Sequence, residues 1–303
     1  MTSPHRLAIA SVLLLAAILP QPALAQQAQP TSPVLPLPST QWPSGDQALT
    51  ELGRSLVNCY ASMIVGQQWD QLEQFLAPCD QSVRFNGASD RSANLEAIKK
   101  LNLKAPTITE IHGTRVGDVL IVASMMIADE VVAGQRLPTD PRGRLGAFAV
   151  IDGSWKLLAW ANLNSPSPRP PPGSPAFAGD SVLNSQAGEL VTRVVTAQFQ
   201  KDWAAFDAML SPGLQVVNFN GVHNLDRVRD GSRRAEITAA PSVTDARGTA
   251  CGDCLIATCN LSLPQKVGVF SSLPADPAPF LAVFIRSGDA WQVAALASTN
   301  RPE

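Results

Sequence analysis

The chain has 303 residues, of which 45% are hydrophobic and 16% charged, and its formal net charge at pH 7 is −2. At about one domain per 100 to 200 residues, this length predicts two domains. The 23 basic residues form no long block, which speaks against nucleic acid as a partner. The densest basic cluster, between Arg227 and Arg234, is interleaved with Asp226 and Asp230 and is typical of a solvated helical face.

The first 25 residues have the pattern of a secretory signal peptide. Arg6 precedes an apolar run from Leu7 to Leu19, and Ala23-Leu24-Ala25 is a small-residue cleavage motif. The run is too short to span a bilayer, and no later segment is long and apolar enough. We therefore expect an exported protein, periplasmic or extracellular, without a stable membrane anchor after cleavage. Residues 26–43, rich in Gln and Pro, are expected to form a disordered leader.

The rest of the chain contains two copies of one unit. The sequence Phe-Asn-Gly at Phe85 recurs at Phe219, 134 residues later (219 − 85), and Trp155 recurs at Trp291, 136 residues later (291 − 155). An offset that changes by only two residues over this span indicates two complete domains. We assign the first domain to residues 44–164, a proline-rich linker to residues 165–180 and the second domain to residues 181–303.

The first copy reads as helices followed by strands. Apolar residues at helical spacing predict a long helix from Ser44 to Ile64, a short helix follows from Trp69, and Asp90 or Ser92 can cap a third. Between the second and third helices, residues 82–85 predict a short strand. From Thr107 onward four β-rich runs are paired by turn dipeptides at residues 117–118 and 152–153, which indicates two antiparallel hairpins.

The second copy repeats this order. A long helix is predicted over residues 181–200, a short helix over residues 203–210, a strand over residues 214–219 and a sheet over residues 243–297. Its third helix, over residues 225–234, is polar and weakly patterned, so we expect it to be shortened or loose. Both copies are thus α+β units in which the helices close the open side of a strongly curved antiparallel sheet.

This order resembles the nuclear transport factor 2-like superfamily, and in particular its SnoaL-like and polyketide-cyclase-like branch. The resemblance rests on the long first helix, SVRFNG before a helix, GDVLIVAS, and the closing strand DGSWKLLAWANL; it covers residues 46–164 and, more weakly, residues 181–301. The resemblance implies two tandem cone-shaped domains, each enclosing an apolar pocket. It also implies pairing through the outer face of the sheet, so the two copies are expected to pack as an intramolecular pseudo-dimer.

Few residues of the sequence are suited to catalysis. Enzymes of this family use titratable groups inside the cone for proton transfer, and the only candidates are His112, in a sheet strand, and His223, near Asp226. Neither has a counterpart in the other copy. The predicted ligand-binding side chains are aromatic or amide groups: Tyr60, Trp69, Asn86, Trp160, Asn162, Trp203, Asn220 and Asn300. Trp69 and Trp203 have packing as their simpler role, and the Asn-Gly pairs have a turn as theirs.

Cysteine is the more informative chemistry, because exported thiols tend to oxidise. Cys59 and Cys79 can form a disulfide that bridges the helices of the first copy. Cys251 and Cys254 can form a second one across the turn that they flank, which leaves Cys259 without a disulfide partner. Cys-x-x-Cys at a hairpin tip favours a structural bridge over a redox site. The sequence carries no nucleotide, hydrolase or metalloprotease motif and no cluster of metal ligands, so we expect neither metal nor cofactor.

Three functions fit these observations. The first is an exported, non-catalytic protein that binds a small apolar or amphipathic ligand, or a protein partner, in a cone-shaped pocket. The second is a SnoaL-like enzyme of isomerase, cyclase or dehydratase type, with His112 or His223 as base and Asn162 or Asn220 polarising an oxygen. The third is a structural envelope protein whose cones are filled by side chains. An open cone with a buried titratable group, an open cone with neutral polar groups, or no cavity would separate them.

Overall fold

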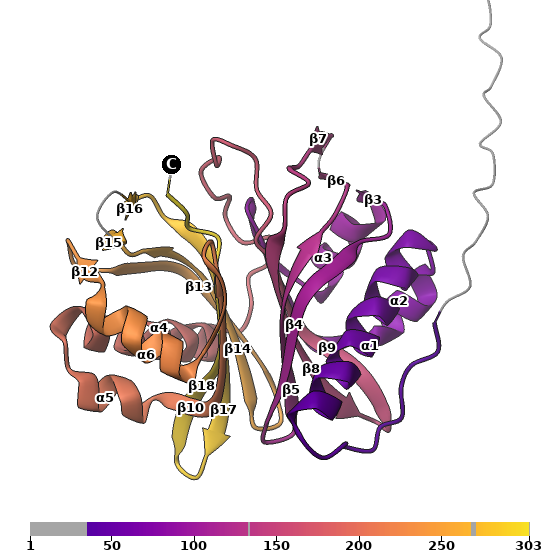
Figure 1. Cartoon of the computed structure of the whole chain (residues 1–303), viewed down its shortest axis with the longest axis horizontal. Helices are drawn as coiled ribbons and strands as arrows, with labels where there is room; N and C mark the ends of the chain where they lie inside the picture. The colour runs from indigo at the N-terminus through magenta and orange to yellow at the C-terminus, as the bar shows by residue number, and fades with distance from the viewer. Residues whose placement is uncertain (1–34, 133, 268–270, 303) are drawn as a thin grey trace, which may run out of the picture. The chain divides into compact units, whose positions relative to one another are not determined.

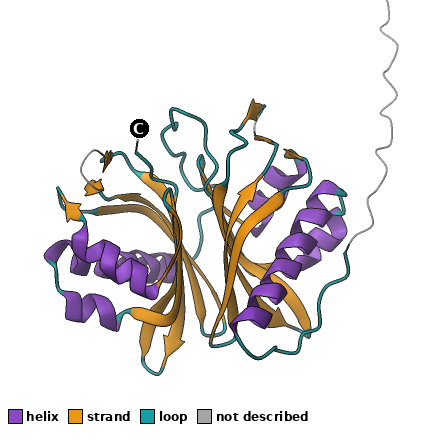
Figure 2. Cartoon of the chain, viewed as in Figure 1, coloured by secondary structure: helices purple, strands orange, loops and turns teal. Residues whose placement is uncertain are grey.

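A computed structural model describes residues 35–132, 134–267 and 271–302. The described chain has two similar halves, each an α+β unit with three helices and a curved, open six-stranded sheet (Figure 1). In Figure 2 the helices of each half cover one face of its own sheet, and the other faces of the two sheets lie side by side. The predicted signal peptide and the first half of the predicted leader, residues 26–34, lie outside the described residues.

The first half begins with its three helices and the hairpin between the second and the third. The bounds are α1 Asp46–Val65, α2 Trp69–Phe75, β1 Leu76–Arg84, β2 Gly87–Asp90 and α3 Arg91–Lys99. The strands that follow are β3 Asn102–Leu103, β4 Thr107–Val116, β5 Val119–Ile127, β6 Glu130–Val132, β7 Gln135–Arg136, β8 Arg142–Ile151 and β9 Ser154–Asn162. The six-stranded sheet has the order β2-β1-β9-β8-β5-β4, and β3, β6 and β7 form a small sheet beside it.

The second half repeats every element. The bounds are α4 Ser181–Gln200, α5 Trp203–Ala208, β10 Leu210–Asn218, β11 Gly221–Asn224, α6 Leu225–Arg234 and β12 Glu236–Ile237. They continue with β13 Ser242–Cys251, β14 Cys254–Ser262, β15 Gln265–Val267, β16 Ser271–Leu273, β17 Ala278–Ser287 and β18 Ala290–Ser298. The sheet order β11-β10-β18-β17-β14-β13 matches the first half strand for strand. The helix expected to be short or loose, α6, is a full ten-residue helix.

Both sheets are mixed, which corrects the expectation of purely antiparallel sheets. The β4–β5 and β8–β9 hairpins form as predicted, but β1 runs parallel to β9, and β10 runs parallel to β18. The Phe-Asn-Gly segments form the β1–β2 and β10–β11 hairpins, with Gly87 and Gly221 at positive φ and the asparagines not. The periodicity within a single strand does not reveal which strand it pairs with, so the parallel pairing of the first strand with the last one was not predicted.

Three apolar clusters form the core. One lies between the helices and the sheet of the first half and includes Leu56, Phe75 and Phe148; another lies at the same place in the second half and includes Val191 and Phe284. The third joins the outer faces of both sheets, with Ile121 and Leu145 from the first half and Val283 from the second. The two halves therefore share a core in addition to having one each.

Hydrogen bonds cross between the halves in a reciprocal way. Thr249 Oγ1 donates to the carbonyl of Cys79 over 2.6 Å, and Thr114 Oγ1 donates to the carbonyl of Gly213 over 2.8 Å. Thr114 and Thr249 hold matching positions in the two copies, as do Cys79 and Gly213. Gln81 adds a bond to Thr249 (2.9 Å) and accepts one from Thr258 (2.6 Å). Each copy thus offers the other the same pair of groups at this contact.

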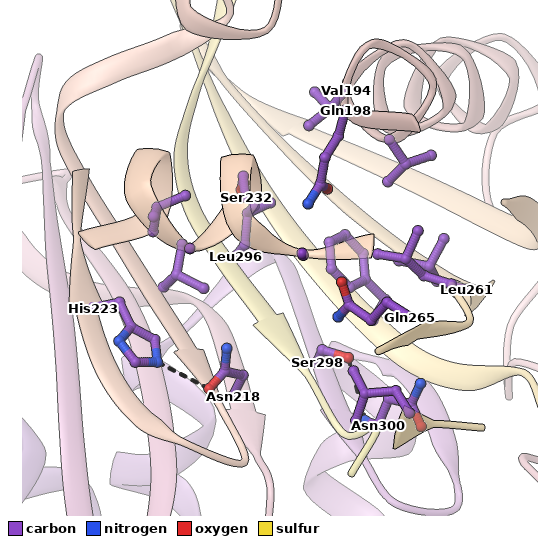
Figure 3. Close-up of a pocket in the computed structure, with 18 of the residues that line it drawn as sticks. Val194, Gln198, Asn218, His223, Ser232, Leu261, Gln265, Leu296, Ser298 and Asn300 are labelled. Atoms are coloured by element: carbon purple, nitrogen blue, oxygen red, sulfur yellow. Dashed lines mark hydrogen bonds between the residues drawn. The ribbon is translucent and has the colours of Figure 1, made fainter. Parts of the chain in front are cut away.

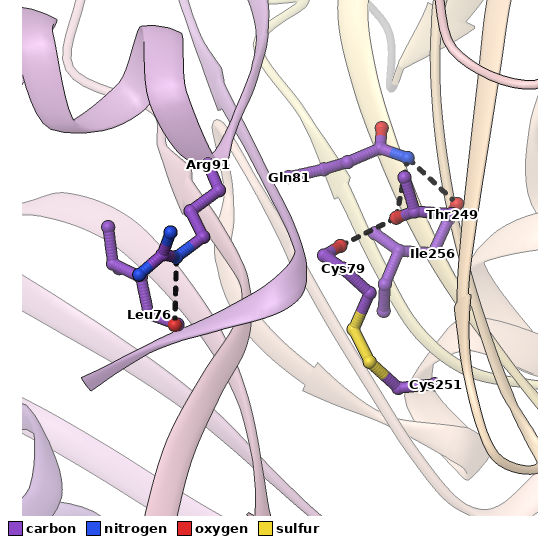
Figure 4. Close-up of a disulfide and its surroundings, with 7 residues drawn as sticks. All are labelled: Leu76, Cys79, Gln81, Arg91, Thr249, Cys251 and Ile256. Carbon is purple, nitrogen blue, oxygen red and sulfur yellow. Dashed lines mark hydrogen bonds between the residues drawn. A yellow bond between two sulfur atoms is a disulfide. The ribbon is translucent and has the colours of Figure 1, made fainter. Parts of the chain in front are cut away.

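The disulfide joins Cys79 to Cys251 and therefore links the two halves (Figure 4). Both predicted local bridges are wrong. Cys79 and Cys251 pack at the shared core between the sheets, whereas Cys59 lies in the core of the first half, where its thiol donates to the carbonyl of Pro36. Cys59, Cys254 and Cys259 are buried free thiols. Cys59 and Cys79 lie on opposite sides of the first sheet, which prevents a bridge between them. Cys254 is paired with Cys251 across the turn, but Cys251 bonds to Cys79 of the facing sheet instead.

Residues at the start of the described chain contact the first half, in contrast to the expected disorder up to residue 43. Trp42 packs edge-on against Trp155, with ring centroids 5.1 Å apart, and the guanidinium of Arg115 lies 4.1 Å from the centroid of the Trp42 ring. Trp155 Nε1 donates to the carbonyl of Ser39. Between β9 and α4, residues 163–180 contain neither helix nor strand, and Gly173 N–H donates to the carbonyl of Asn86. No helix among the described residues has the length and apolarity needed to cross a membrane.

Candidate functional site

The second half encloses a cavity of about 330 Å³ between its helices and its sheet. Its walls are mostly aliphatic and aromatic: Val191, Val194, Val195, Phe206, Val216, Leu261, Leu263, Leu273, Phe280, Ala282, Phe284 and Leu296. Because the lining residues Asn220, Arg227, Gly231 and Arg234 are exposed, the cavity reaches the surface beside α6. This volume and lining are those of a small-molecule pocket.

Strand register gathers several polar groups at one end of this cavity. β10 and β18 are parallel, with Val216 opposite Leu296, and they end at Asn218 and Ser298 respectively. Asn300 follows, with its amide nitrogen donating to the carbonyl of Pro274. Figure 3 shows His223, Asn218, Ser298 and Asn300 along one edge and Val194 of α4 at the opposite edge. The cavity therefore has an apolar wall and a polar end made of uncharged groups.

His223 is the one titratable group buried in this lining, and its hydrogen bond fixes its tautomer. Asn218 Oδ1 accepts from the backbone N–H of Asn220 over 2.8 Å, so it is an acceptor toward His223 Nε2 as well, 3.0 Å away. Nε2 therefore carries the hydrogen, and Nδ1 is bare; Nδ1 is buried and has no partner among the described residues. Burial, followed by the positive charge of Arg227, lowers the pKa of His223, so the ring is neutral near pH 7.

The equivalent space in the first half is nearly filled, with a cavity of about 40 Å³. The registers β1–β9 and β10–β18 place Trp160 where the second half has Leu296. The helix alignment that pairs Trp69 with Trp203 places Tyr60 where the second half has Val194. The rings of Tyr60 and Trp160 lie against each other in the first half, with centroids 4.9 Å apart. Exchange of two rings for two aliphatic side chains opens the second cone.

Charged groups fill the rest of the first cone. The matched registers place Arg84 and Arg144 at the positions of Asn218 and Phe280. Arg144 Nη2 lies 2.9 Å from Glu130 Oε1, with both side chains buried. Glu130 also accepts from Asn162 (3.0 Å) and Asn164 (2.7 Å). The carboxylate of Glu130 is thus paired and hydrogen-bonded on both oxygens without a ligand.

A second buried group of the first half is Asp80. Its Oδ2 accepts from Asn94 Nδ2 over 2.9 Å, and Asn94 in turn accepts from Arg84 over 3.1 Å. Burial raises the pKa of Asp80 to about 7, and the bond from Asn94 and the charge of Arg84 offset only part of this effect. Burial likewise raises the pKa of Tyr60. Asp80 has Leu214 as its counterpart in the second half, so this group is specific to the first.

The predicted binding residues are divided among three places. Tyr60, Trp160 and Asn162 line the small cavity of the first half. Asn220 and Asn300 line the large cavity of the second. The remaining three lie at neither cavity: Trp69 and Trp203 are half-buried and pack on the cores of their halves, and Asn86 is exposed in its turn.

The two histidines are separated in the same way. His112 is half-exposed on β4, and its Nε2 lies 3.1 Å from the exposed carboxylate of Glu110. His223 is 8% exposed and lines the large cavity. Sequence reasoning missed Asn218 and Gln265, which line the large cavity, and Arg84, Glu130 and Arg144, which fill the small one. A signal for them lies in the comparison of the two copies, because residues at matched positions differ in charge: Arg84 matches Asn218, and Arg144 matches Phe280.

No family model matches the chain, and no curated protein matches it. Among solved structures, an NTF2-like protein from Cytophaga hutchinsonii is 13% identical, with a TM-score of 0.32, over 37% of this chain and 93% of its own. An NTF2-like protein of unknown function in nutrient uptake from Rhodospirillum rubrum is 16% identical, with a TM-score of 0.32, over 36% of this chain and 93% of its own. A conserved protein from Planctomyces limnophilus is 14% identical, with a TM-score of 0.33, over 40% and 97%.

These solved structures, the first two of them named NTF2-like, each cover well under half of this chain. By the order of its own helices and strands, the chain is an α+β protein with an NTF2-like fold in two similar halves. The order of the helices and the strand order of each sheet define that fold; the likenesses say nothing about what the chain binds.

Proposed function

We propose that the second half binds a small, largely apolar molecule in its cavity and that the first half is a closed scaffold. The observation that carries this proposal is the contrast of about 330 Å³ with about 40 Å³ at the same place in one duplicated frame. An unfilled apolar cavity lowers stability relative to a packed core. The first half demonstrates that this frame can be packed, so the open cone of the second half is best explained by an occupant.

The volume and lining indicate the size and kind of ligand. The cavity of 330 Å³ is about twice the ~150 Å³ of an engineered apolar cavity that holds benzene, which points to a molecule of two fused rings or similar bulk. Asn218, Ser298 and Asn300 can hydrogen-bond one polar group of the ligand. The ligand is therefore amphipathic, with its apolar part against Val194 and Leu296.

The experiment that tests this function is calorimetric titration of the full chain with naphthalene-2-carboxamide. Ligand-efficiency limits place the dissociation constant on the order of 100 µM. Leu296→Trp introduces the ring of the first half into the cavity and is expected to abolish binding. Val182→Trp is the matched control, because Val182 is exposed on α4, outside the cavity. Absence of binding to the wild-type chain at millimolar probe, or unchanged binding to Leu296→Trp, would contradict the proposal.

Proton transfer is the second candidate function, and one observation favours it: His223 is a neutral imidazole in the lining of the cavity. The hydrogen bonding of His223, however, favours ligand binding over proton transfer. Nε2–H donates to Asn218, and Nδ1, the nitrogen able to accept a proton, is covered. Hydrogen–deuterium exchange at the acidic carbon of 2-tetralone, followed by NMR in D₂O, separates the two functions. Exchange above the buffer rate that is lost in His223→Ala and kept in His112→Ala would establish an enzyme.

We further infer that the two copies form an intramolecular pseudo-dimer and that the protein is exported. The reciprocal bonds of Thr114 and Thr249 and the shared core between the sheets support the first inference. The disulfide between Cys79 and Cys251 supports the second, because such bonds persist in oxidising compartments. Mass spectrometry of the chain purified from its natural source tests export directly: a mature protein that begins at Met1 would contradict it.

A further inference from the structure

The ionised side chains that line the cavity are all positively charged. Among the described residues that line the cavity, the ionised side chains are Arg227 and Arg234, and no carboxylate is among them. Both arginines belong to α6 and are exposed, at the side where the cavity reaches the surface. The buried polar end offers only uncharged groups. An entering ligand therefore meets positive charge at the mouth that the lining itself does not neutralise.

Arg227 differs from the other arginines of α6. Arg229 Nε and Arg233 Nη2 lie 3.1 Å and 2.7 Å from the oxygens of Asp207, and Arg234 lies 3.6 Å from Asp230. Arg227 makes no ion pair with any residue that the structure describes. The pairs with Asp207 tie α6 to α5 and so hold the helix, and with it Arg227, in place beside the cavity. A guanidinium held in this way is suited to bind an oxyanion through two parallel hydrogen bonds.

Two further features place Arg227, at the mouth, beside the polar end of the cavity. Its positive charge is one of the causes that lower the pKa of His223, which requires the two groups to be close. Its backbone N–H is capped by Asn224 Oδ1 over 3.1 Å, so Arg227 lies in the first turn of α6, where the helix dipole also favours negative charge. Arg227, His223 and Asn218 therefore border the same end of the site.

We propose that the ligand of this cavity carries a carboxylate that is bound by Arg227, which makes it a small aromatic or alicyclic acid. This inference rests on the proposed function and specifies its ligand class. The ring system occupies the apolar wall, and the carboxylate lies at the mouth between Arg227 and the amide of Asn218. A neutral molecule of the same shape fills the wall equally well but leaves Arg227 to solvent.

The test compares two probes of nearly the same shape, 2-naphthoate and naphthalene-2-carboxamide, by calorimetric titration of the full chain. A charge-assisted hydrogen bond at an exposed guanidinium is expected to make the naphthoate bind about fivefold to tenfold more tightly. Arg227→Gln is expected to remove this preference and to leave the affinity for the carboxamide unchanged. Arg193→Gln is the matched control, because it removes the same charge from α4, another helix at the cavity, at an exposed residue that does not line it.

The outcomes distinguish this inference from the proposed function. If neither probe binds, the proposed function fails. If both bind with equal affinity, or if Arg227→Gln and Arg193→Gln weaken naphthoate binding equally, a cavity ligand remains but the carboxylate proposal is overturned. A preference that survives in Arg227→Gln also overturns it.

The NMR titration of His223 gives an independent readout. The charged groups that act on this ring are Arg227 on α6 and Glu110 on β4, and its hydrogen-bond partner is Asn218. Bound 2-naphthoate adds negative charge and is expected to raise the pKa of His223, whereas the carboxamide is not. His112, half-exposed and outside the cavity, is the internal control. An unchanged His223 titration with saturating naphthoate would place the carboxylate elsewhere and contradict the proposal.

Discussion

The buried carboxyl of Asp80 is expected to make the stability of the first half depend on pH. Asp80 is 1% exposed, and burial raises its pKa to about 7, against about 3.9 in an unfolded chain. Between these values the folded state keeps a proton that the unfolded state has released. The free energy of unfolding therefore falls as pH rises from about 4 to about 7 and is level above that. At ~1.36 kcal/mol per pH unit, the window corresponds to about 4 kcal/mol.

Asp80→Asn removes this dependence while it keeps an oxygen that can accept from Asn94. We expect the variant to match the wild-type chain near pH 4 and to exceed it by about 4 kcal/mol near pH 8. The assay is urea unfolding followed by tryptophan fluorescence at several pH values. The difference between the two proteins isolates Asp80, because the other titrating groups are common to both.

A matched control is Asp118→Asn, whose side chain is 93% exposed in the β4–β5 turn. It removes one carboxyl at an exposed position, so its difference from the wild-type chain is the baseline against which the Asp80→Asn difference is compared. The reasoning about Asp80 is refuted if Asp80→Asn differs from the wild-type chain by a constant amount across the range. It is also refuted if the variant becomes less stable relative to the wild-type chain as pH rises, since the fold would then favour the charged form of Asp80.

Three further predictions concern the cavity and the cysteines. Leu296→Trp with Val194→Tyr, which installs the rings of the first half, is expected to raise stability by about 0.5–2 kcal/mol, or a few degrees in thermal midpoint, by scanning calorimetry; a lower midpoint would show that the two cones differ in more than side-chain volume. Cys79→Ala with Cys251→Ala opens a cross-link that spans 172 residues and is expected to lower the free energy of unfolding by about 2–5 kcal/mol in urea; a loss below about 1 kcal/mol would mean that the shared core alone holds the halves. In the wild-type chain, burial raises the pKa of Cys254 and Cys259 to about 12. These two thiols are therefore expected to react with a thiol reagent at pH 8 only after denaturation, and fast reaction of either one would contradict their burial.

Much of the architecture could be predicted from the sequence because local patterns carry it. The recurrence of Phe-Asn-Gly, of Trp69 at Trp203 and of Trp155 at Trp291 revealed the duplication, and helical periodicity placed the helices within a few residues of α1, α2, α4 and α5. Asp90, one of two predicted caps, does accept from the backbone of Ala93 at the start of α3. Turn dipeptides gave the β4–β5 and β8–β9 hairpins, since a short turn brings the two strands that it joins side by side.

The tertiary structure alone decided which groups meet. The disulfide is the clearest case: Cys79 is 20 residues from Cys59 (79 − 59) and 172 from Cys251, yet it bonds to the distant one. The two sheets pack face to face, and this packing brings β1 and β13 together. The parallel pairing of β1 with β9 likewise depends on the closure of the whole sheet.

The open and the filled cone were not distinguishable from either copy by itself. Tyr60 and Trp160 were predicted as ligand contacts but fill the small cavity. Val194 and Leu296 were not predicted as lining residues, yet they line the large cavity. The physical reason is that a cavity is the difference between the volume a backbone encloses and the volume its side chains occupy. The sequence determines the second quantity at each position, but only the fold brings these positions around one space.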